Sequence, residues 1–287
     1  MSLGSIFDDD GHLNGALLKF RRGRHHGQVI QLFIQQFLNT HPYKVVPEAD
    51  PKTSHHIVFR TSVREQPPLE WGPIIGDVAH NWRSTLDHIA WQLVKVRGNG
   101  RTSTRTQFPI FDEDPFIPSK PSDPRKVKER RQRALDRFNG QVSGMRQADV
   151  ALIKRLQPYN RRKGPKGHPL SILARLSNWD KHNELALSGQ TLRGYRLRYR
   201  DRRNARFQII DVKPPGLFED GTELGRGVFV ETGPNSNMHV DLIFDFDIAF
   251  EEGPPLDGLG VKEALIKMGY YVSYVLLRFK ARFDKQI

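Results

Sequence analysis

The stretch GDVAHNWRSTLDHIAW at residues 76–91 decides how this chain folds and where its candidate site lies. Apolar residues recur in it every three or four positions, which is the spacing of an amphipathic helix. At about 100° per residue they form one stripe on that helix. The stripe consists of Val78, Trp82, Leu86, Ile89 and, just beyond the stretch, Leu93. We therefore expect a helix over residues 73–95 with this stripe in the core.

The other positions of this helix are polar, but they are not the Glu, Lys and Gln of an ordinary solvated face. Arg83 and Asp87 border the apolar stripe and are i,i+4 neighbours, so their side chains can meet. We expect a functional site here, and the alternative is a polar network that locks the helix to its neighbours. Further candidate residues lie nearly opposite the stripe: Asp77, His80, Asn81, Ser84 and His88.

A second helix is expected over residues 169–186, because its first residue is a proline and an arc of leucines follows. Asp180 falls in the same arc if the helix continues that far, and a buried carboxylate needs a cationic or donor partner. We therefore expect the two helices to pack with Asp180 near the polar face of the first one, where Arg83, His80 and His88 are the candidate partners. The alternative is that the helix ends earlier and leaves this segment on the surface. The candidates on this segment are Asp180, Lys181 and His182.

The rest of the pattern predicts an α+β protein. Further helices are expected over residues 13–38, 124–138, 147–156 and 261–283, a hairpin over 43–46 and 56–63, and strands over 195–199, 207–212, 227–231 and 239–246. The apolar segment 108–111 should tuck inward from a long loop. We expect a helical body with a small N-terminal hairpin, and a C-terminal antiparallel sheet closed by the final helix.

The domain organisation follows from the same pattern. Residues 1–12 are expected to be a flexible tail, 13–190 a mainly helical domain with the hairpin inserted, and 191–287 the sheet with the final helix packing back on the helical body. A single domain is the alternative, since one sheet shared with the hairpin would join the two parts.

The charge balance points to an anionic partner. The 287 residues include 45 Lys and Arg against 32 Asp and Glu, a formal net charge of +13. Such an excess favours nucleic acid or nucleotides, and we expect RNA rather than DNA. Solvated faces are the alternative for each basic cluster. The clusters lie at 19–26, 125–133, 161–168 and 193–206, and the last interleaves Tyr195 and Tyr199 with arginines.

Several protein classes lack support in the sequence. The chain has no Cys, which excludes disulfides and thiolate metal sites and suits a reducing cytoplasm. No apolar run reaches the roughly 18 residues that a membrane span needs, and the acidic N-terminus does not resemble a signal peptide. The glycine patterns of phosphate-binding loops, dinucleotide-binding folds and hydrolase nucleophile elbows are also missing. We expect a cytoplasmic protein without a membrane partner.

Three motifs together resemble a family of uncharacterised bacterial hypothetical proteins. They are GDxxHNxRSxLDH at 76–88, QPY at 157–159, and HPLxxL at 168–173 followed by DKH at 180–182. The resemblance extends from about residue 13 to the final helix. It implies a bacterial source and no established activity.

The spacing of Arg83 and His88, Arg-x4-His, also resembles that of the HEPN ribonucleases. This resemblance implies a helical bundle, a homodimer with the site near its two-fold axis, and metal-independent RNA cleavage without a cofactor, of toxin or antiphage-defence type. The 2′-hydroxyl of the RNA attacks its own phosphate there. Carried over, Arg83 would hold the phosphate, His88 would move the proton, and Asp87 or Asp180 would orient one of them.

Two other functions stay open at the level of sequence. A non-catalytic nucleic-acid or nucleotide-binding protein would use the basic clusters alone. A metal-dependent hydrolase would draw nitrogen and oxygen ligands for Zn, Mn or Fe from a wider set, in which either histidine of the first helix could join Asp180 or His182. The set is His80, Asp87 or Asp77, His88, Asp180 and His182. His80 and His88 are two helical turns apart, about 12 Å, so one ion cannot bind both.

Overall fold

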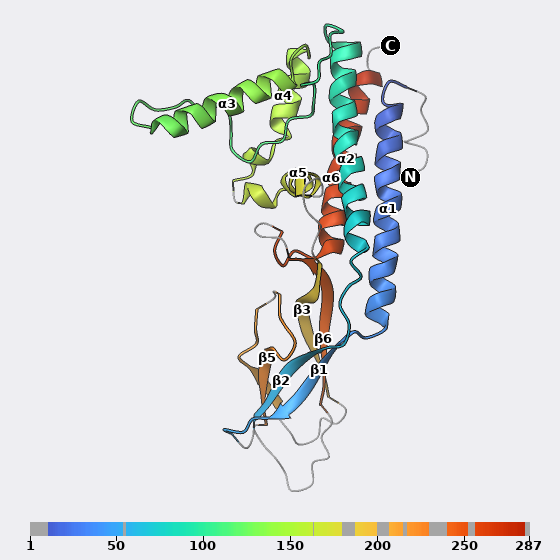
Figure 1. Ribbon diagram of the computed structural model, residues 1–287, viewed down its shortest axis with the longest axis vertical. Coiled ribbons are helices and arrows are strands. Elements are labelled where there is room, and N and C mark those ends of the chain that lie inside the picture. Colours follow the sequence, from blue (N-terminus) through green and yellow to red (C-terminus); the bar gives the residue numbers. More distant parts are fainter. Residues whose placement is uncertain are drawn as a thin grey trace. The chain divides into compact units, whose positions relative to one another are not determined.

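The computed structural model describes residues 11–53, 56–162, 164–179, 187–199, 207–214, 217–229, 240–251 and 256–284. Within these ranges the chain forms six α-helices and two antiparallel sheets (Figure 1). It divides into two compact units. The first holds the described residues of Met1–Val29, Pro73–Glu184 and Ala264–Ile287, and the second those of Ile30–Gly72 and Leu185–Glu263.

The helices lie close to where the apolar periodicity predicts them. They are α1 (Asn14–Asn39), α2 (Trp71–Gln92), α3 (Arg125–Gln141), α4 (Gln147–Arg155), α5 (Pro169–Trp179) and α6 (Val261–Asp284). A π-helical turn, Leu93–Arg97, extends α2. The segment 180–186, where the α5 helix was expected to continue, lies outside the described residues.

The predicted apolar stripe of α2 forms the core of the first unit. Val78, Leu86, Ile89 and Leu93 are fully buried, and Trp82 is 4% exposed. Burying a large apolar side chain stabilises a fold by about 1.5–3 kcal/mol, so this stripe accounts for the position of α2.

Trp82 sets the distances between α2 and its two long neighbours, α1 and α6. A methyl group placed on Gly23 of α1 would come within 2.7 Å of the Trp82 ring, and one on Gly269 of α6 within 2.9 Å. Glycines at these two positions therefore let both helices contact the indole directly. In the first unit, α1 and α6 run alongside α2, and α3, α4 and α5 lie on the side of α2 away from α1 (Figure 1).

The larger sheet, in the second unit, joins strands from both ends of the sequence. Its order is β1 (Tyr43–Ala49), β2 (His56–Val63), β5 (Glu223–Phe229) and β4 (Phe207–Ile210), all antiparallel. A separate two-stranded sheet pairs β3 (Leu187–Tyr199) with β6 (Val240–Phe250). In the second unit, Phe218 and Leu224 form a small hydrophobic core with Val45 and Phe246.

These pairings confirm the α+β class and differ from the expected division of the chain. The hairpin β1–β2 belongs to the same sheet as β5 and β4, whereas the sequence grouped it with the helices. One boundary between the two units, Glu184/Leu185, lies close to the expected division at residue 190, and α6 from Ala264 onward belongs to the first unit. A HEPN-like bundle and closure of the sheet by the final helix stay predictions.

Candidate functional site

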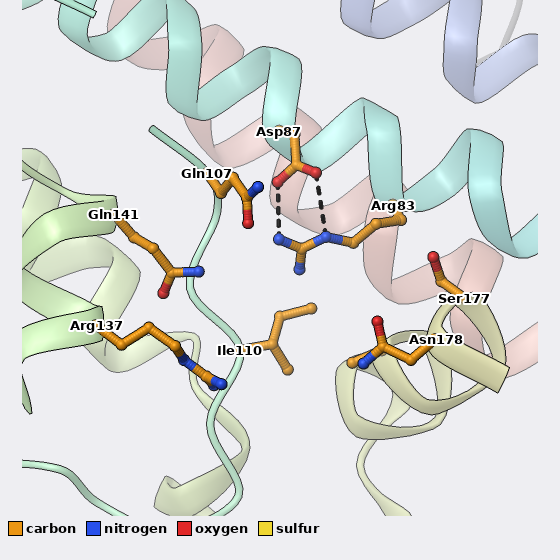
Figure 2. Close-up of a pocket in the computed structure, with 9 residues that line it drawn as sticks. Arg83, Asp87, Gln107, Ile110, Arg137, Gln141, Ser177 and Asn178 are labelled. Atoms are coloured by element: carbon orange, nitrogen blue, oxygen red, sulfur yellow. Dashed lines mark hydrogen bonds and ion pairs between the residues drawn. The ribbon is translucent and has the colours of Figure 1, made fainter. Parts of the chain in front are cut away.

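A cavity of about 240 Å³ lies beside α2 in the first unit. Figure 2 shows its wall, to which α2, α3, α5 and the loop after α2 all contribute. Most of the lining side chains are polar or charged. The lining residues are Arg83, Asp87, Gln107, Ile110, Arg137, Gln141, Ala174, Ser177 and Asn178.

Arg83 and Asp87 form the ion pair that their spacing on α2 predicts. Arg83 Nε donates to Asp87 Oδ2 at 3.2 Å, and Arg83 Nη2 donates to Asp87 Oδ1 at 2.8 Å. The two side chains are 16% and 30% exposed. A bidentate ion pair that is largely buried is stronger and better oriented than a solvent-exposed ion pair.

The same pair holds the loop that forms one wall of the cavity. Asp87 Oδ1 accepts a hydrogen bond from the Phe108 N–H at 2.9 Å, and Arg83 Nη2 donates to the Phe108 carbonyl at 2.8 Å. The Phe108 ring is fully buried and packs edge-on against Phe279 of α6. The inward position expected for this loop is confirmed, and part of the polar face of α2 is architectural.

Gln157, the first residue of the QPY motif, fixes the same loop one and three residues after Phe108. Its Oε1 accepts from the Phe111 N–H at 3.1 Å, and its Nε2 donates to the Pro109 carbonyl at 2.8 Å. The Gln157 side chain is buried, so these backbone groups have no access to water there. Because both ends of the loop are held, this wall is preformed.

Arg137 enters the cavity from α3 and has no carboxylate partner among the described residues. Its guanidinium lies 4.3 Å from the centre of the Phe111 ring, a cation–π contact. Burial, and then the positive charge of Arg83, lower the pKa of Arg137. An arginine remains charged despite such a shift, so two guanidinium groups face this cavity.

Positive charge is therefore in excess in the cavity. Asp87 is the single acidic residue of the lining, and it already accepts hydrogen bonds from Arg83 and Phe108. Neutral hydrogen-bonding groups surround the two arginines, and Gln141 Oε1 is buried without a partner among the described residues. A guanidinium group without a carboxylate partner, as in Arg137, set among amides and a hydroxyl, is typical of a site for an oxyanion.

The structure does not bring His88 and Arg83 together within one chain. His88 is exposed, and its Nδ1 lies 2.9 Å from where a methyl group on Gly15 of α1 would be. It contributes nothing to the lining of the cavity, which Arg83 enters from the other side of α2. The catalytic roles that the HEPN resemblance implies for this pair stay predictions.

The other polar residues of α2 also lie outside the cavity. Asp77 and His80 are exposed, and Ser84 is partly exposed. Asn81 is buried, and its Nδ2 donates to the Asp77 carbonyl one turn earlier at 2.8 Å. The polar face that the sequence predicted as one site therefore divides, and Arg83 and Asp87 alone reach the cavity.

The C-terminal end of α5 reaches the cavity, as the expected packing of the two helices requires. Ser177 and Asn178 line it opposite Arg83 (Figure 2). The residues that the sequence singled out there, Asp180, Lys181 and His182, lie outside the described residues, and their roles stay predictions.

A metal centre, the alternative that the sequence raised, stays a prediction, because two of its expected ligands lie outside the described residues. Among the described residues, no three His, Asp or Glu side chains are close enough together to hold one metal ion. The two expected ligands that lie outside the described residues are Asp180 and His182.

Sequence reasoning missed Arg137, Gln141 and the loop residues of the cavity. The segment 125–133 was noted for its charge, but Arg137 follows it and stands next to the buried Phe138. The available signal was helical spacing, because Arg137 continues a row of basic residues along α3. The loop gave no periodic signal, since its position depends on contacts with Asp87 and Gln157, which are distant in sequence.

Comparison with family models, with curated proteins and with solved structures found no match to this chain. Among the described residues, no helix is long and apolar enough to cross a membrane. The function must therefore be argued from the cavity itself.

Proposed function

We propose that this protein binds a phosphate-bearing ligand, a nucleotide or the end of a nucleic acid, in the cavity beside α2. The observation that carries the proposal is the meeting of two guanidinium groups, Arg83 and Arg137, with one carboxylate that is already fully engaged. A phosphate monoester carries about 1.5–2 negative charges near neutral pH and offers three acceptor oxygens. It would supply the charge that the cavity lacks.

The unused donors favour this ligand. Arg83 uses Nε and Nη2 in the bonds to Asp87 and Phe108, and its Nη1 has no hydrogen-bond partner among the described residues. The guanidinium of Arg137 contacts the Phe111 ring and forms no ion pair with any of the described residues. The positive charge of Arg83 lowers the pKa of Arg137, and an anion between them would relieve this repulsion.

The size of the cavity limits what can enter it. Its volume of about 240 Å³ lies between the roughly 150 Å³ that admits benzene and the roughly 300–1,000 Å³ of pockets for drug-sized ligands. This space suits a phosphate with the sugar attached to it, and the remainder of a larger ligand would extend outside.

Calorimetric titration with adenosine 5′-monophosphate and with adenosine tests the proposal. We expect the monophosphate to bind and adenosine to bind at least tenfold more weakly. Arg137→Gln should weaken binding of the monophosphate about tenfold, since a charge-assisted hydrogen bond contributes about 1.5–3 kcal/mol. Arg133→Gln is the matched control, because Arg133 lies one turn away on α3, is 80% exposed and does not line the cavity.

Equal binding of adenosine and its monophosphate would contradict the proposal, as would an Arg137→Gln variant that binds like the wild type. Arg83→Gln is a poorer test, because Arg83 also holds the Phe108 carbonyl and its loss would disturb the loop.

Metal-independent RNA cleavage is the second function we propose, supported by the position of Arg83 in the cavity and by the sequence resemblance. Arg83 would hold the phosphate, and because His88 of the same chain does not line the cavity, His88 of a second copy in the homodimer that the resemblance implies would move the proton. Incubation with total RNA in EDTA should then give cleavage that disappears in His88→Ala. Cleavage that needs added Mn²⁺ or Zn²⁺ would favour a metal-dependent hydrolase, and RNA binding without cleavage would leave the binding function alone.

A further inference from the structure

A row of four cationic side chains runs along one face of α3 and ends at the cavity. Lys126, Arg130, Arg133 and Arg137 are spaced by four, three and four residues, so at about 100° per residue they fall within about 60° of one another. All four are exposed. We call them the cationic row, and its last member, Arg137, is the one that lines the cavity.

A neighbouring side of α3, about 110° around the helix from the row, holds the helix in place. Phe138 is buried, and its ring packs against Phe111 at 5.9 Å and Phe116 at 4.9 Å between ring centres. Lys126, Arg130 and Arg133 have no part in this packing, whereas Arg137 also contacts the Phe111 ring, at 4.3 Å from its centre. The row is therefore a surface feature that reaches the packed side of α3 only at its last member.

The acidic residues near the cationic row neutralise its positive charge only weakly. Arg130 pairs with Glu113 at 3.0 Å, with side chains 66% and 75% exposed, and Arg133 pairs with Glu129 at 3.5 Å. Exposed pairs of this kind contribute about 0–1 kcal/mol and are screened by salt, so a polyanion can displace them. Lys126 forms no ion pair within the described residues.

We propose that the ligand is a single-stranded RNA whose terminal phosphate enters the cavity and whose backbone follows the cationic row. This rests on the function proposed for the cavity. The row extends along α3 for about 16 Å at about 1.5 Å per residue, with neighbouring cations about 4.5–6 Å apart along the axis. A row of evenly spaced cations leading to an anion site matches a chain of phosphates that ends in a phosphate monoester.

The surroundings favour an RNA strand over other polyanions. None of the exposed large apolar side chains among the described residues lies on α3, so this face lacks what an interfacial membrane helix would insert into lipid. The cavity is too small for a duplex end. Its amides and hydroxyl, those of Gln107, Gln141, Asn178 and Ser177, can hydrogen-bond to ribose hydroxyls.

The test is fluorescence anisotropy with RNA strands of about ten nucleotides, a length within the usual site sizes, with and without a terminal phosphate at either end. We expect a terminal phosphate to tighten binding at least fivefold in the wild type and not in Arg137→Gln. Lys126→Gln/Arg133→Gln should weaken binding about tenfold. It should also reduce the slope of log K against log salt by about 1.4, because each phosphate contact contributes about 0.7 for a single strand.

The matched control is Arg125→Gln/Lys128→Gln, which removes the same charge from exposed positions of the same helix outside the row. Equal weakening by both double variants would overturn the proposal, because it would show a response to net charge alone. Tighter binding to phosphatidylserine vesicles than to RNA would overturn it as well.

The two proposals can fail separately. If adenosine 5′-monophosphate binds in an Arg137-dependent way but the cationic row does not affect RNA binding, the RNA proposal is wrong and the cavity proposal stands. If the monophosphate does not bind, the cavity proposal is wrong, and the RNA proposal that rests on it is overturned too.

Discussion

Individual side chains in this protein both fix the loop that follows α2 and line the cavity. The Arg83–Asp87 pair binds both backbone groups of Phe108 and also contributes the charges of the cavity. The sequence predicted this pair, because an i,i+4 spacing is sufficient to bring two side chains together. It did not predict Arg137 as a residue of the cavity. Arg83, which lines the same cavity, lies on another helix and 54 positions earlier in the sequence (137 minus 83), so no local pattern connects the two.

His168 is a residue whose environment makes stability depend on pH. Its ring is buried and stacks edge-on against Tyr271 at 4.5 Å, and its Nδ1 accepts a hydrogen bond from the Leu170 N–H at 3.1 Å. Burial, with a smaller contribution from Arg161 and an opposing one from Asp112, lowers the pKa of His168 from 6.5 to about 4.

The lowered pKa of His168 predicts a loss of stability in mild acid. The folded state favours the neutral ring, so the contribution is complete above pH 6.5 and is lost as the pH falls towards 4, where the unfolded chain binds the proton first. The slope is at most about 1.4 kcal/mol per pH unit. His168→Asn keeps an acceptor for Leu170, so its urea unfolding should depend less on pH between 4 and 6.5. An unchanged dependence would count against this assignment.

At the scale of elements, the fit of α1 against α2 depends on Trp82. The sequence predicted both helices and the buried stripe, since each shows as a periodicity within one segment. It gave no account of why α1 carries glycines in its middle, because the reason is the indole of another helix.

Two glycines four residues apart on α1 give a matched prediction. A methyl group on Gly23 would lie 2.7 Å from Trp82, whereas one on Gly27 would meet Trp82 and Val78 at 4.0 Å, an ordinary contact. Ala is favoured over Gly in a helix by about 1 kcal/mol, and forced overpacking costs about 1–3 kcal/mol. In urea unfolding, Gly27→Ala should therefore stabilise the protein by up to about 1 kcal/mol.

Gly23→Ala should instead destabilise the protein by about 1–2 kcal/mol, the balance of overpacking against helix propensity. Equal effects of the two substitutions would show that Trp82 does not control this contact.

For the whole molecule, sequence patterns predicted elements better than their associations. The antiparallel strands were expected, but the pairing of β2 with β5 was not, because strands at positions 56–63 and 223–229 carry no local sign of their partner. The net charge of +13 predicts an anionic partner, yet it does not show where one would bind. We propose the cavity as that position, because two arginines line it around one engaged carboxylate.

The most direct test of the central claim is the rate at which phenylglyoxal modifies individual arginines, followed by peptide mass spectrometry with and without saturating adenosine 5′-monophosphate. The account predicts that the nucleotide slows modification of Arg137 at least fivefold and leaves Arg133, on the same helix outside the cavity, unchanged. Arg137 modified at the same rate with and without the nucleotide would contradict it.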